Sequence, residues 1–519
     1  MKKTNFKDSS FIIFIAIALF YAIGNFIWWK INTPIIPVTI SALHFNDIFK
    51  DGYLYYNAPL ITWIMKSMFY IFGKKYFDLQ IIGVNYIFFL ISLFFMYKLG
   101  LHLKDKETGN ISMMLFALTP VVYEMSRTYG HQDWHVMIFM IANIYCLIKT
   151  DDFTSRKWSI FYGITIGLGL LVKDEFLPYF FAPWLYVAVR SLIKNAEKRK
   201  ILNILTTVII GILISGCHYL RYEIIQKILH EPVIETLPIF TFKSLGTTTT
   251  CLSKCLLFPL LFIIFAIAFV LFIYKNKNKD KYIFILWLIV PWIIITFMPH
   301  HKKPEYCLGF VPVMILISSA FITNIKINNK KILLTVLGII YLFQYMFLTG
   351  VKDISYLDKR IYGVHSVARE TYCVDKEKTD FCIKIASYID KYSISRRVMF
   401  DNTSIKALTK IDRYFLETTS NLYFPKIKIC DYNSRNYDGC DVFLTTKNGI
   451  CSIDNLEIAL DEYQHFINSP LETEESKKQY IGKKIKEIEK FKNFIKDNFV
   501  FIETIPYNDT VIEIYKLAK

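Results

Sequence analysis

The chain has 519 residues, of which 54% are hydrophobic and 17% aromatic, and its formal charge is +17. A mean hydropathy of +0.34 argues against a purely soluble protein, because soluble domains rarely contain so much apolar sequence. Much of the positive charge lies in short segments between apolar runs, where it orients membrane spans. Nucleic acid is therefore not an expected partner, and the lipid bilayer is.

The first two thirds of the chain consist mainly of apolar runs, and a run of about 20 residues can cross a bilayer. We predict eleven spans, at 10–29, 78–101, 109–124, 134–149, 158–172, 176–193, 201–219, 256–274, 282–298, 305–323 and 332–349. The remainder is charged and mixed. The prediction is an α-helical polytopic membrane domain over 1–350 and a soluble domain over 351–519.

Five short basic segments recur at every second gap between the apolar runs. They are Lys104–Lys106, Arg156–Lys157, Lys194–Lys200, Lys275–Lys281 and Lys326–Lys331. Cytoplasmic loops carry such an excess of Lys and Arg, and we interpret Lys194–Lys200 only as this orientation signal. With a cytoplasmic N-terminus and a first span that is retained, an odd number of spans predicts an extracytoplasmic C-terminal domain. The Lys-, Ile- and Asn-rich usage favours a bacterial plasma membrane.

The loops outside the membrane include a long first one, over 30–77. It contains two candidate amphipathic helices, at about 38–50 and 58–72, and the apolar stripe of the second suits a helix in the interface plane.

The C-terminal domain is predicted to be a small α/β domain. Its strands are expected at Arg397–Phe400, Lys426–Cys430 and Asp441–Thr445, its helices at 378–392 and 474–497, and a terminal hairpin at Phe499–Ile505 and Thr510–Tyr515. Five of the ten cysteines lie here, so an extracytoplasmic location permits one or two disulfides of undefined pairing.

Charged residues gather in the predicted outer loops, and ionisable groups at membrane depth are functional candidates because they are costly to place there. The groups are His44 with Asp47 and Asp51; Arg127, His131, Asp133 and His135; Lys173, Asp174 and Glu175; and His300, His301, Lys302, Lys303 and Glu305. Carboxylates beside several cations suit the transfer of a group from a lipid phosphate to a hydroxyl. Cations would hold the phosphate and a carboxylate would accept the hydroxyl proton.

Four segments, in the same order and spacing over about residues 50–350, resemble the GT-C glycosyltransferases of the protein O-mannosyltransferase and lipid A aminoarabinose transferase type. They are Tyr56–Leu60 running on to Phe72-Gly73, Thr119-Pro120 with Ser126-Arg127 and Asp133, Gly167–Lys173, and Pro304–Pro312. The resemblance implies a membrane enzyme with a polyprenyl-phosphate-linked sugar donor and a glycan, lipid or protein acceptor. It also suits the predicted outer α/β domain.

The resemblance implies roles for individual residues. An acid usually follows the first span directly, but residues 30–46 contain none, so Asp47 is expected to be the base, with Asp51 as the alternative. Asp133 would act beside the base. Lys173 and Arg127 would contact the donor phosphate, together with Lys302 or Lys303, since Glu305 stands where the family has Arg. Secondary candidates are His131, Asp174, Glu175, His300 and His301.

Each of these residues also has a purely structural interpretation. Asp133 could cap a helix, Lys173 could be a boundary lysine that reaches for the interface, and Arg127 could pair with Asp133 or Glu124. The histidines could hold a divalent metal ion, but none has a paired spacing. No resident cofactor is otherwise implied.

Two other classes stay open at this point. A transporter or flippase of a lipid-linked glycan would also have many spans, but it usually shows matching halves or spans broken near the midplane. A scaffold protein would not need several charged clusters on one face. The related oligosaccharyltransferases carry a Trp-Trp-Asp-Tyr-Gly signature, which Trp28-Trp29-Lys30 does not match.

Overall fold

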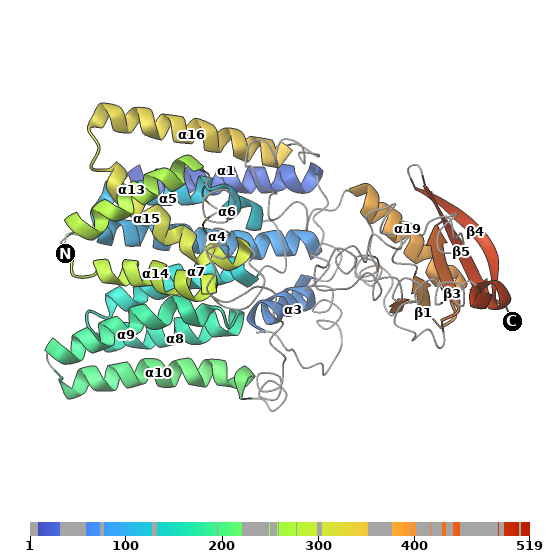
Figure 1. Ribbon diagram of the computed structural model, residues 1–519, viewed down its shortest axis with the longest axis horizontal. Helices are drawn as coiled ribbons and strands as arrows, with labels where there is room; N and C mark the ends of the chain where they lie inside the picture. Colours follow the sequence, from blue (N-terminus) through green and yellow to red (C-terminus); the bar gives the residue numbers. More distant parts are fainter. Residues whose placement is uncertain are drawn as a thin grey trace, which may run out of the picture. The chain divides into compact units, whose positions relative to one another are not determined.

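The computed structural model describes the chain in two compact units, drawn in Figure 1. The described residues are 9–31, 59–72, 77–126, 132–194, 196–220, 249, 257, 259–276, 278–297, 304–350, 376–395, 397–400, 416, 428–431, 440–446, 486, 493–507 and 510–518. Those up to 350 form a helical unit and those from 376 form a sheet unit. The predicted boundary at 350/351 adjoins residues outside the described ranges and stays a prediction.

The helical unit places a helix at each predicted span. The helices are α1 (Ser9–Ile31), α3 (Leu60–Phe72), α4 (Phe77–Leu103), α5 (Lys106–Leu118), α6 (Pro120–Met125), α7 (Gln132–Lys149), α8 (Arg156–Val172), α9 (Phe176–Lys194), α10 (Lys198–Tyr219), α13 (Pro259–Lys275), α14 (Lys281–Phe297), α15 (Val311–Ile322) and α16 (Ile327–Gly350), with the 3₁₀ helix η2 (Pro304–Phe310) before α15. Most lie side by side with their axes nearly aligned (Figure 1).

Four of the described helices, α1, α4, α9 and α10, are both long and apolar enough to cross a membrane. Shorter apolar segments lie in α7, α13, α14 and α15. The outward faces of α1, α10 and α16 expose large apolar side chains, as expected for helices in contact with lipid. The chain is therefore an integral membrane protein, as predicted.

Two predicted spans are not continuous α-helices. The span predicted at 109–124 breaks at Thr119, which is extended (φ −66°, ψ 125°) because the following Pro120 disfavours the helical conformation at the residue before it. The span predicted at 305–323 begins with η2, and the α-helix starts only at Val311.

Glycines bring α8 and α10 into close contact. A Cβ on Gly163 would lie 2.9 Å from the carbonyl oxygen of Thr207, and one on Gly167 would lie 2.5 Å from the Cβ of Ile214. Small residues four apart on one face let helix backbones approach closely, which matters in lipid, where no hydrophobic effect drives helices together. The two helices therefore pack as one pair.

A network of ion pairs and hydrogen bonds, centred on the buried Asp280, joins the helices at the end of the unit where α9 finishes. The Arg190 guanidinium contacts the carboxylate of Asp152 and lies 3.0 Å from that of Asp280, and Nε2 of His102 lies 3.0 Å from the other oxygen of Asp280. Burial raises the pKa of Asp280, but the His102 and Arg190 contacts outweigh it, so that the pKa is lowered. These contacts join the end of α4, the turn between α7 and α8, the end of α9 and the segment before α14.

The turn between α7 and α8 is part of this network and has an unusual backbone. Asp151, Asp152 and Phe153 have positive φ angles of 49°, 53° and 59°. The Ser191 hydroxyl donates to the Asp152 carbonyl (2.6 Å), and the Asn203 amide donates to that of Phe153 (2.8 Å). Such conformations cost energy and persist where the surroundings fix them.

The sheet unit contains α19 (Lys376–Tyr392) and a sheet whose described strands are β1 (Arg397–Phe400), β2 (Lys428–Asp431), β3 (Val442–Thr446), β4 (Phe499–Tyr507) and β5 (Thr510–Leu517). The strand order is β2-β1-β3-β5-β4. β1 pairs in parallel with β2 and β3, with Val398 opposite Val442, and β5 pairs antiparallel with β3 and β4. The α/β prediction and the terminal hairpin are confirmed.

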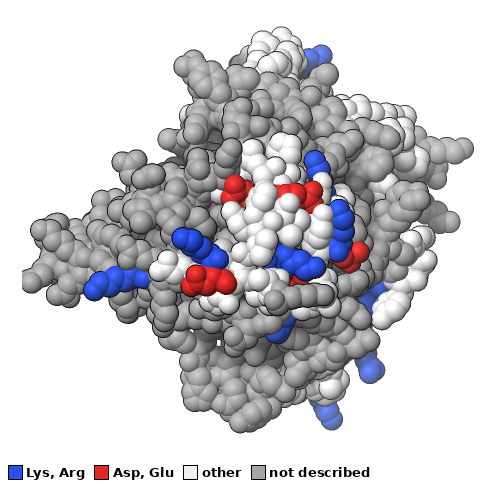
Figure 2. All heavy atoms as spheres, turned by 90° about the vertical axis from the view of Figure 1, so that its right-hand side faces the viewer, with Lys and Arg blue, Asp and Glu red and all other residues white. Residues whose placement is uncertain are grey.

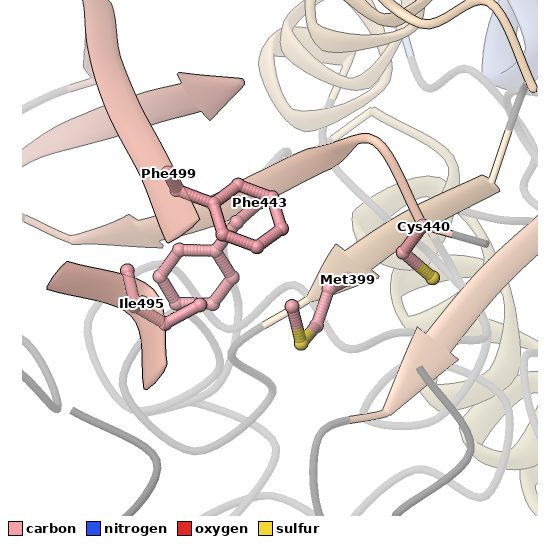
Figure 3. Packing of buried hydrophobic residues seen from close by; sticks show 5 residues of the cluster. All are labelled: Met399, Cys440, Phe443, Ile495 and Phe499. Atoms are coloured by element: carbon pink, nitrogen blue, oxygen red, sulfur yellow. The ribbon is translucent and has the colours of Figure 1, made fainter. Parts of the chain in front are cut away.

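The core of the sheet unit explains why β3 is buried along its whole length. Phe443 of β3 packs with Phe499 of β4 and with Ile495, from the short helical segment before β4, beside Met399 and Cys440 (Figure 3). Of the helix predicted at 474–497, most residues lie outside the described ranges.

On the face seen in Figure 2, the described Lys and Arg side chains alternate with Asp and Glu. Neither sign of charge therefore dominates the described part of this face.

Asp441 fixes the turn that precedes β1. Its carboxylate accepts hydrogen bonds from the backbone N–H groups of Ile394 (2.6 Å) and Ser395 (2.8 Å) and from the hydroxyls of Ser393 and Ser395. Burial raises the pKa of Asp441, but these hydrogen bonds outweigh it and the pKa lies below the ordinary value for aspartate.

A lowered pKa in the folded state means that Asp441 adds stability above pH 4 or so and that this is lost as the pH falls through its folded pKa. Asp441→Asn is expected to lower the free energy of unfolding by about 1–2 kcal/mol at pH 7. Thermal unfolding of the full chain from pH 8 to pH 3 should show the difference from wild type shrinking below about pH 4. Asp497→Asn, at an exposed position, is the control. A difference that does not depend on pH would contradict this role.

Candidate active site

The connections of the chain fix which helix ends lie together. The short turn 150–155 makes α7 and α8 antiparallel, and the turn 173–175 does the same for α8 and α9, so the start of α7, the end of α8 and the start of α9 share one end. α14 starts beside the end of α9, where Asp280 meets Arg190, and therefore finishes at that same shared end. We call it the outer end, after the predicted topology.

The turn between α8 and α9 presents three charged residues in succession at the outer end. The Lys173 N–H donates to the Gly169 carbonyl (3.1 Å), and Lys173 itself is extended (φ −166°, ψ 146°), which ends α8. The N–H groups of Phe176 and Leu177 then donate to the carbonyls of Lys173 (3.2 Å) and Asp174 (3.0 Å), which starts α9.

Gly169 allows this tight turn. A Cβ at this position would lie 2.4 Å from the Phe176 ring, so only glycine permits the first residue of α9 to pack against the last turn of α8. Asp174 and Glu175 directly precede α9, where negative charge interacts favourably with the helix dipole. The local sequence therefore places one cation at the end of a helix and two anions at the start of the next.

Lys173 and Glu175 form an ion pair within the turn. The Lys173 Nζ lies 3.0 Å from Glu175 Oε1, and the two side chains are 19% and 31% exposed. The pair orients the Lys173 ammonium, and both side chains keep part of their surface exposed. A half-buried ammonium of this kind can contact a phosphate, and the paired carboxylate limits its movement.

Tyr219, the last residue of α10, lies beside this turn. Its hydroxyl donates to the carbonyl of Leu170 (2.9 Å), and Asp174 and Glu175 are close enough to act on it electrostatically. Tyr219 is not among the residues predicted from the sequence. Its position at the outer end of a predicted span, as an aromatic residue with a polar tip, was the available signal.

Two further elements that carry predicted residues meet at the outer end. α7 begins at Gln132, so Asp133 lies in its first turn, and α7 contacts both η2 and α9. The Phe310 ring packs against the Tyr179 ring of α9 at a centroid distance of 5.4 Å. A Cβ on Gly309 would lie 2.5 Å from the Tyr179 ring. The fold thus brings α7, α9 and η2 together.

α3 lies at the end of the helical unit at which α1 finishes, and it contacts α4 and α8 (Figure 1). Ile61 and Met65 are buried, whereas Trp63, Tyr70, Ile71 and Phe72 are exposed. This confirms a helix for the predicted 58–72, and its exposed aromatic side chains suit the membrane interface. The helix predicted at 38–50 lies outside the described residues.

Only part of the predicted site can be placed. Lys173, Asp174 and Glu175 are described in full, and Asp133 is placed by its backbone in α7. The remaining candidates lie outside the described residues and stay predictions: Asp47, Asp51, Arg127, His131, His300, His301, Lys302 and Lys303. Among the described residues, no group of three or more His, Cys, Asp or Glu side chains could hold a metal ion.

Comparisons with known proteins agree with this architecture. Residues 56–218 match the dolichyl-phosphate-mannose-protein mannosyltransferase family. This range begins in the first of the four segments quoted above and includes Asp133 and Lys173. No curated protein matches the sequence as a whole.

Solved structures resemble the chain over most of its length. The structure of ArnT from Cupriavidus metallidurans bound to undecaprenyl phosphate is 12% identical, covers 97% of both chains and has a TM-score of 0.59. The apo structure of the same protein covers 87% of this chain and 94% of its own, with 11% identity and a TM-score of 0.56.

An oligosaccharyltransferase from Archaeoglobus fulgidus, in its apo form, shares the fold more distantly. It is 10% identical, covers 88% of this chain and 71% of its own, and has a TM-score of 0.51. At such identities the likeness concerns the fold, while the sequence pattern over 56–218 is independent of it. The chain therefore shares the fold of ArnT and of the archaeal oligosaccharyltransferase, and residues 56–218 are similar to the dolichyl-phosphate-mannose-protein mannosyltransferase family.

Proposed function

We propose that this protein transfers a sugar from a polyprenyl-phosphate donor to a hydroxyl or phosphate of a glycan, lipid or protein at the outer face of the plasma membrane. The observation that carries the proposal is the Lys173–Glu175 pair, which the α8–α9 turn presents at the outer end within the range of the family match. An embedded enzyme with a cation at the interface suits a donor that has a membrane-bound tail and a phosphate at the surface.

The distribution of charge in the described helices favours transfer over transport. In α4, α7, α8, α9 and α10, every Asp, Glu, Lys and Arg lies within about two turns of a helix end. A flippase or transporter of a lipid-linked glycan would be expected to carry ionisable groups near the midplane along its path. At the end opposite Lys173, Arg190 pairs with Asp152 and Asp280, and His102 contacts Asp280.

The proposed reaction is a single displacement with inversion. Asp47 would accept the proton of the acceptor hydroxyl as its oxygen attacks the anomeric carbon, and the bond from that carbon to the polyprenyl phosphate would break on the opposite face. Lys173, Arg127 and Lys302 or Lys303 would stabilise the departing phosphate. Asp133 would orient the acceptor, and Asp51 is the alternative base.

The proposed function can be tested by analysing the cell envelope of a strain that lacks the gene. Mass spectrometry of surface glycans, lipids and glycoproteins from wild-type and deletion strains should reveal one sugar that is lost from one class of acceptor. Complementation with the intact gene should restore it. Loss of a surface glycan together with accumulation of its lipid-linked form on the cytoplasmic side would favour the flippase alternative. An unchanged envelope would contradict both functions.

The role of Lys173 is tested by binding. Lys173→Ala is expected to weaken binding of undecaprenyl phosphate to the purified protein by about 10- to 100-fold, because hydrogen bonds between charged groups contribute about 1.5–3 kcal/mol. Titration in detergent, followed by native mass spectrometry, measures the effect. Lys173→Arg should retain most of the affinity.

Glu175→Gln separates a ligand role from a structural one. If Lys173 binds phosphate, breaking the ion pair should leave the affinity unchanged or raise it, since the ammonium loses a competing anion. If Lys173 serves only to hold Glu175, both substitutions should alter thermal stability equally and neither should affect lipid binding. The second pattern would rule out the phosphate contact.

A further inference from the structure

Four cations at the starts of α8 and α10 form an exposed cluster, which we call the cationic surface. It comprises Arg156, Lys157, Lys198 and Arg199, all exposed. Within the described parts of the chain, none of the four makes an ion pair. They occupy the end of the helical unit opposite Lys173, which the topology predicts to be cytoplasmic.

The two helix starts are close together in space. α8 and α10 run parallel, because Gly163 faces Thr207 and Leu170 faces Tyr219 along their contact. The hydrogen bond from Asn203 to the Phe153 carbonyl (2.8 Å) joins the segment before α8 to the first turns of α10. The four cations therefore belong to one surface although 40 residues separate them in the sequence.

The carboxylates nearest to this surface are already engaged. Asp152 pairs with Arg190 in the buried network, and Asp151 lies 3.5 Å from Lys279. Glu197, before α10, lies 3.6 Å from the buried Lys200. The positive charge of the cationic surface is therefore not cancelled by its own turns.

Other basic segments at this end have a different role. Lys104 Nζ donates to the side chains of Thr323 (2.7 Å) and Asn324 (2.9 Å), and Lys330 Nζ lies 2.6 Å from Glu107. These lysines tie α4 and α5 to α15 and α16. A basic segment that only orients the chain needs no particular contacts. The lysines above nevertheless join helices, whereas the four residues of the cationic surface make no ion pair within the described parts of the chain.

An apolar stripe continues directly from the cationic surface along α10. Its side chains are Ile201, Leu202, Leu205, Ile209, Ile212 and Leu213, which are 41–71% exposed. α10 lies at the edge of the helical unit in Figure 1, next to α8 and α9. A ligand for this surface therefore needs an anionic head and a long apolar body in line with it.

We propose that the cationic surface and the stripe of α10 bind an anionic phospholipid. The phosphodiester of the headgroup would contact Arg156, Lys157, Lys198 and Arg199, and an acyl chain would lie along the α10 stripe. A soluble phosphate compound would not use the stripe, and a zwitterionic lipid would gain little from four cations. This inference does not depend on the proposed enzymatic function.

Native mass spectrometry of the full chain in detergent tests the proposal with two lipids of identical acyl chains, phosphatidylglycerol and phosphatidylcholine. Wild type should retain phosphatidylglycerol in preference. Basic residues near a membrane surface contribute about 1 kcal/mol each toward anionic lipid, which is about fivefold. Lys157→Gln/Lys198→Gln should therefore weaken phosphatidylglycerol binding by at least about tenfold and leave phosphatidylcholine unaffected.

Lys326→Gln/Lys331→Gln is the matched control, because it removes two exposed lysines from another basic segment of the same end. It should change phosphatidylglycerol binding by less than about twofold. If both double variants lose phosphatidylglycerol binding equally, the effect is one of general charge and the proposed lipid site is wrong. If wild type retains phosphatidylglycerol and phosphatidylcholine equally, the proposal is also wrong. Leu205→Ser should reduce retention of either lipid if the stripe holds an acyl chain, and no change would exclude the stripe.

Discussion

Replacement of Asp47 with asparagine is expected to lower the rate of sugar transfer by about 10²–10⁴-fold, the contribution typical of a positioned general base. The amide keeps the size of the side chain but cannot accept the acceptor proton. In the proposed mechanism other residues hold the phosphate, so binding of the polyprenyl-phosphate donor should survive. Transfer of labelled sugar in proteoliposomes and donor binding, measured on the same preparation, distinguish the two effects.

Asp51→Asn is the matched control, four residues further along the same loop, and should reduce transfer much less. If Asp51→Asn is inactive and Asp47→Asn is as active as wild type, the base is Asp51. If both variants retain activity, neither residue is the base. The carboxylates of Asp133, Asp174 and Glu175 would then be the next candidates.

Replacement of Arg190 with alanine is expected to destabilise the helical unit by about 3–5 kcal/mol, because it removes the cation that two largely buried carboxylates share. Asp152 and Asp280 are 12% and 5% exposed, and Arg190 also donates to the Lys279 carbonyl (3.0 Å). Thermal unfolding of the purified protein in detergent should show a large drop in the midpoint.

The neighbouring pair of Lys279 and Asp151 supplies the control, since both side chains are largely exposed, at 55% and 71%. Lys279→Ala should change the stability by less than about 1 kcal/mol. Arg190→Met combined with Asp152→Asn and Asp280→Asn should recover part of the loss, because no buried charge then remains. If Arg190→Ala is as mild as Lys279→Ala, the network does not hold these helices together.

Much of the fold follows from the sequence because membrane spans and short strands depend on local patterns. All predicted spans coincide with helices, and β1 begins and ends at the predicted residues. The exceptions are also local: Pro120 sets the break at Thr119, and the first turns after Pro304 are 3₁₀. An apolar window cannot reveal either of them, since both concern backbone geometry within an apolar stretch.

The site could be predicted less completely. Lys173 was identified because a charge between two apolar runs is conspicuous, and the ion pair with Glu175 lies within three residues. Tyr219 and the Arg190 network depend on contacts across tens of residues, which no local pattern encodes. Arg190 nevertheless gave a signal, as a charged residue inside a predicted span.

The length of α8 sets a demand on the surrounding bilayer. Its 17 residues span about 25 Å, which is less than the roughly 30 Å of a typical hydrocarbon core. Arg156 stands at one end and Lys173 at the other, and the close glycine contact with α10 keeps α8 from sliding along its neighbour. Local thinning of the lipid beside this helix, or extension of Arg156 and Lys173 toward the interface, would compensate for the difference, so thicker membranes are expected to hinder the protein.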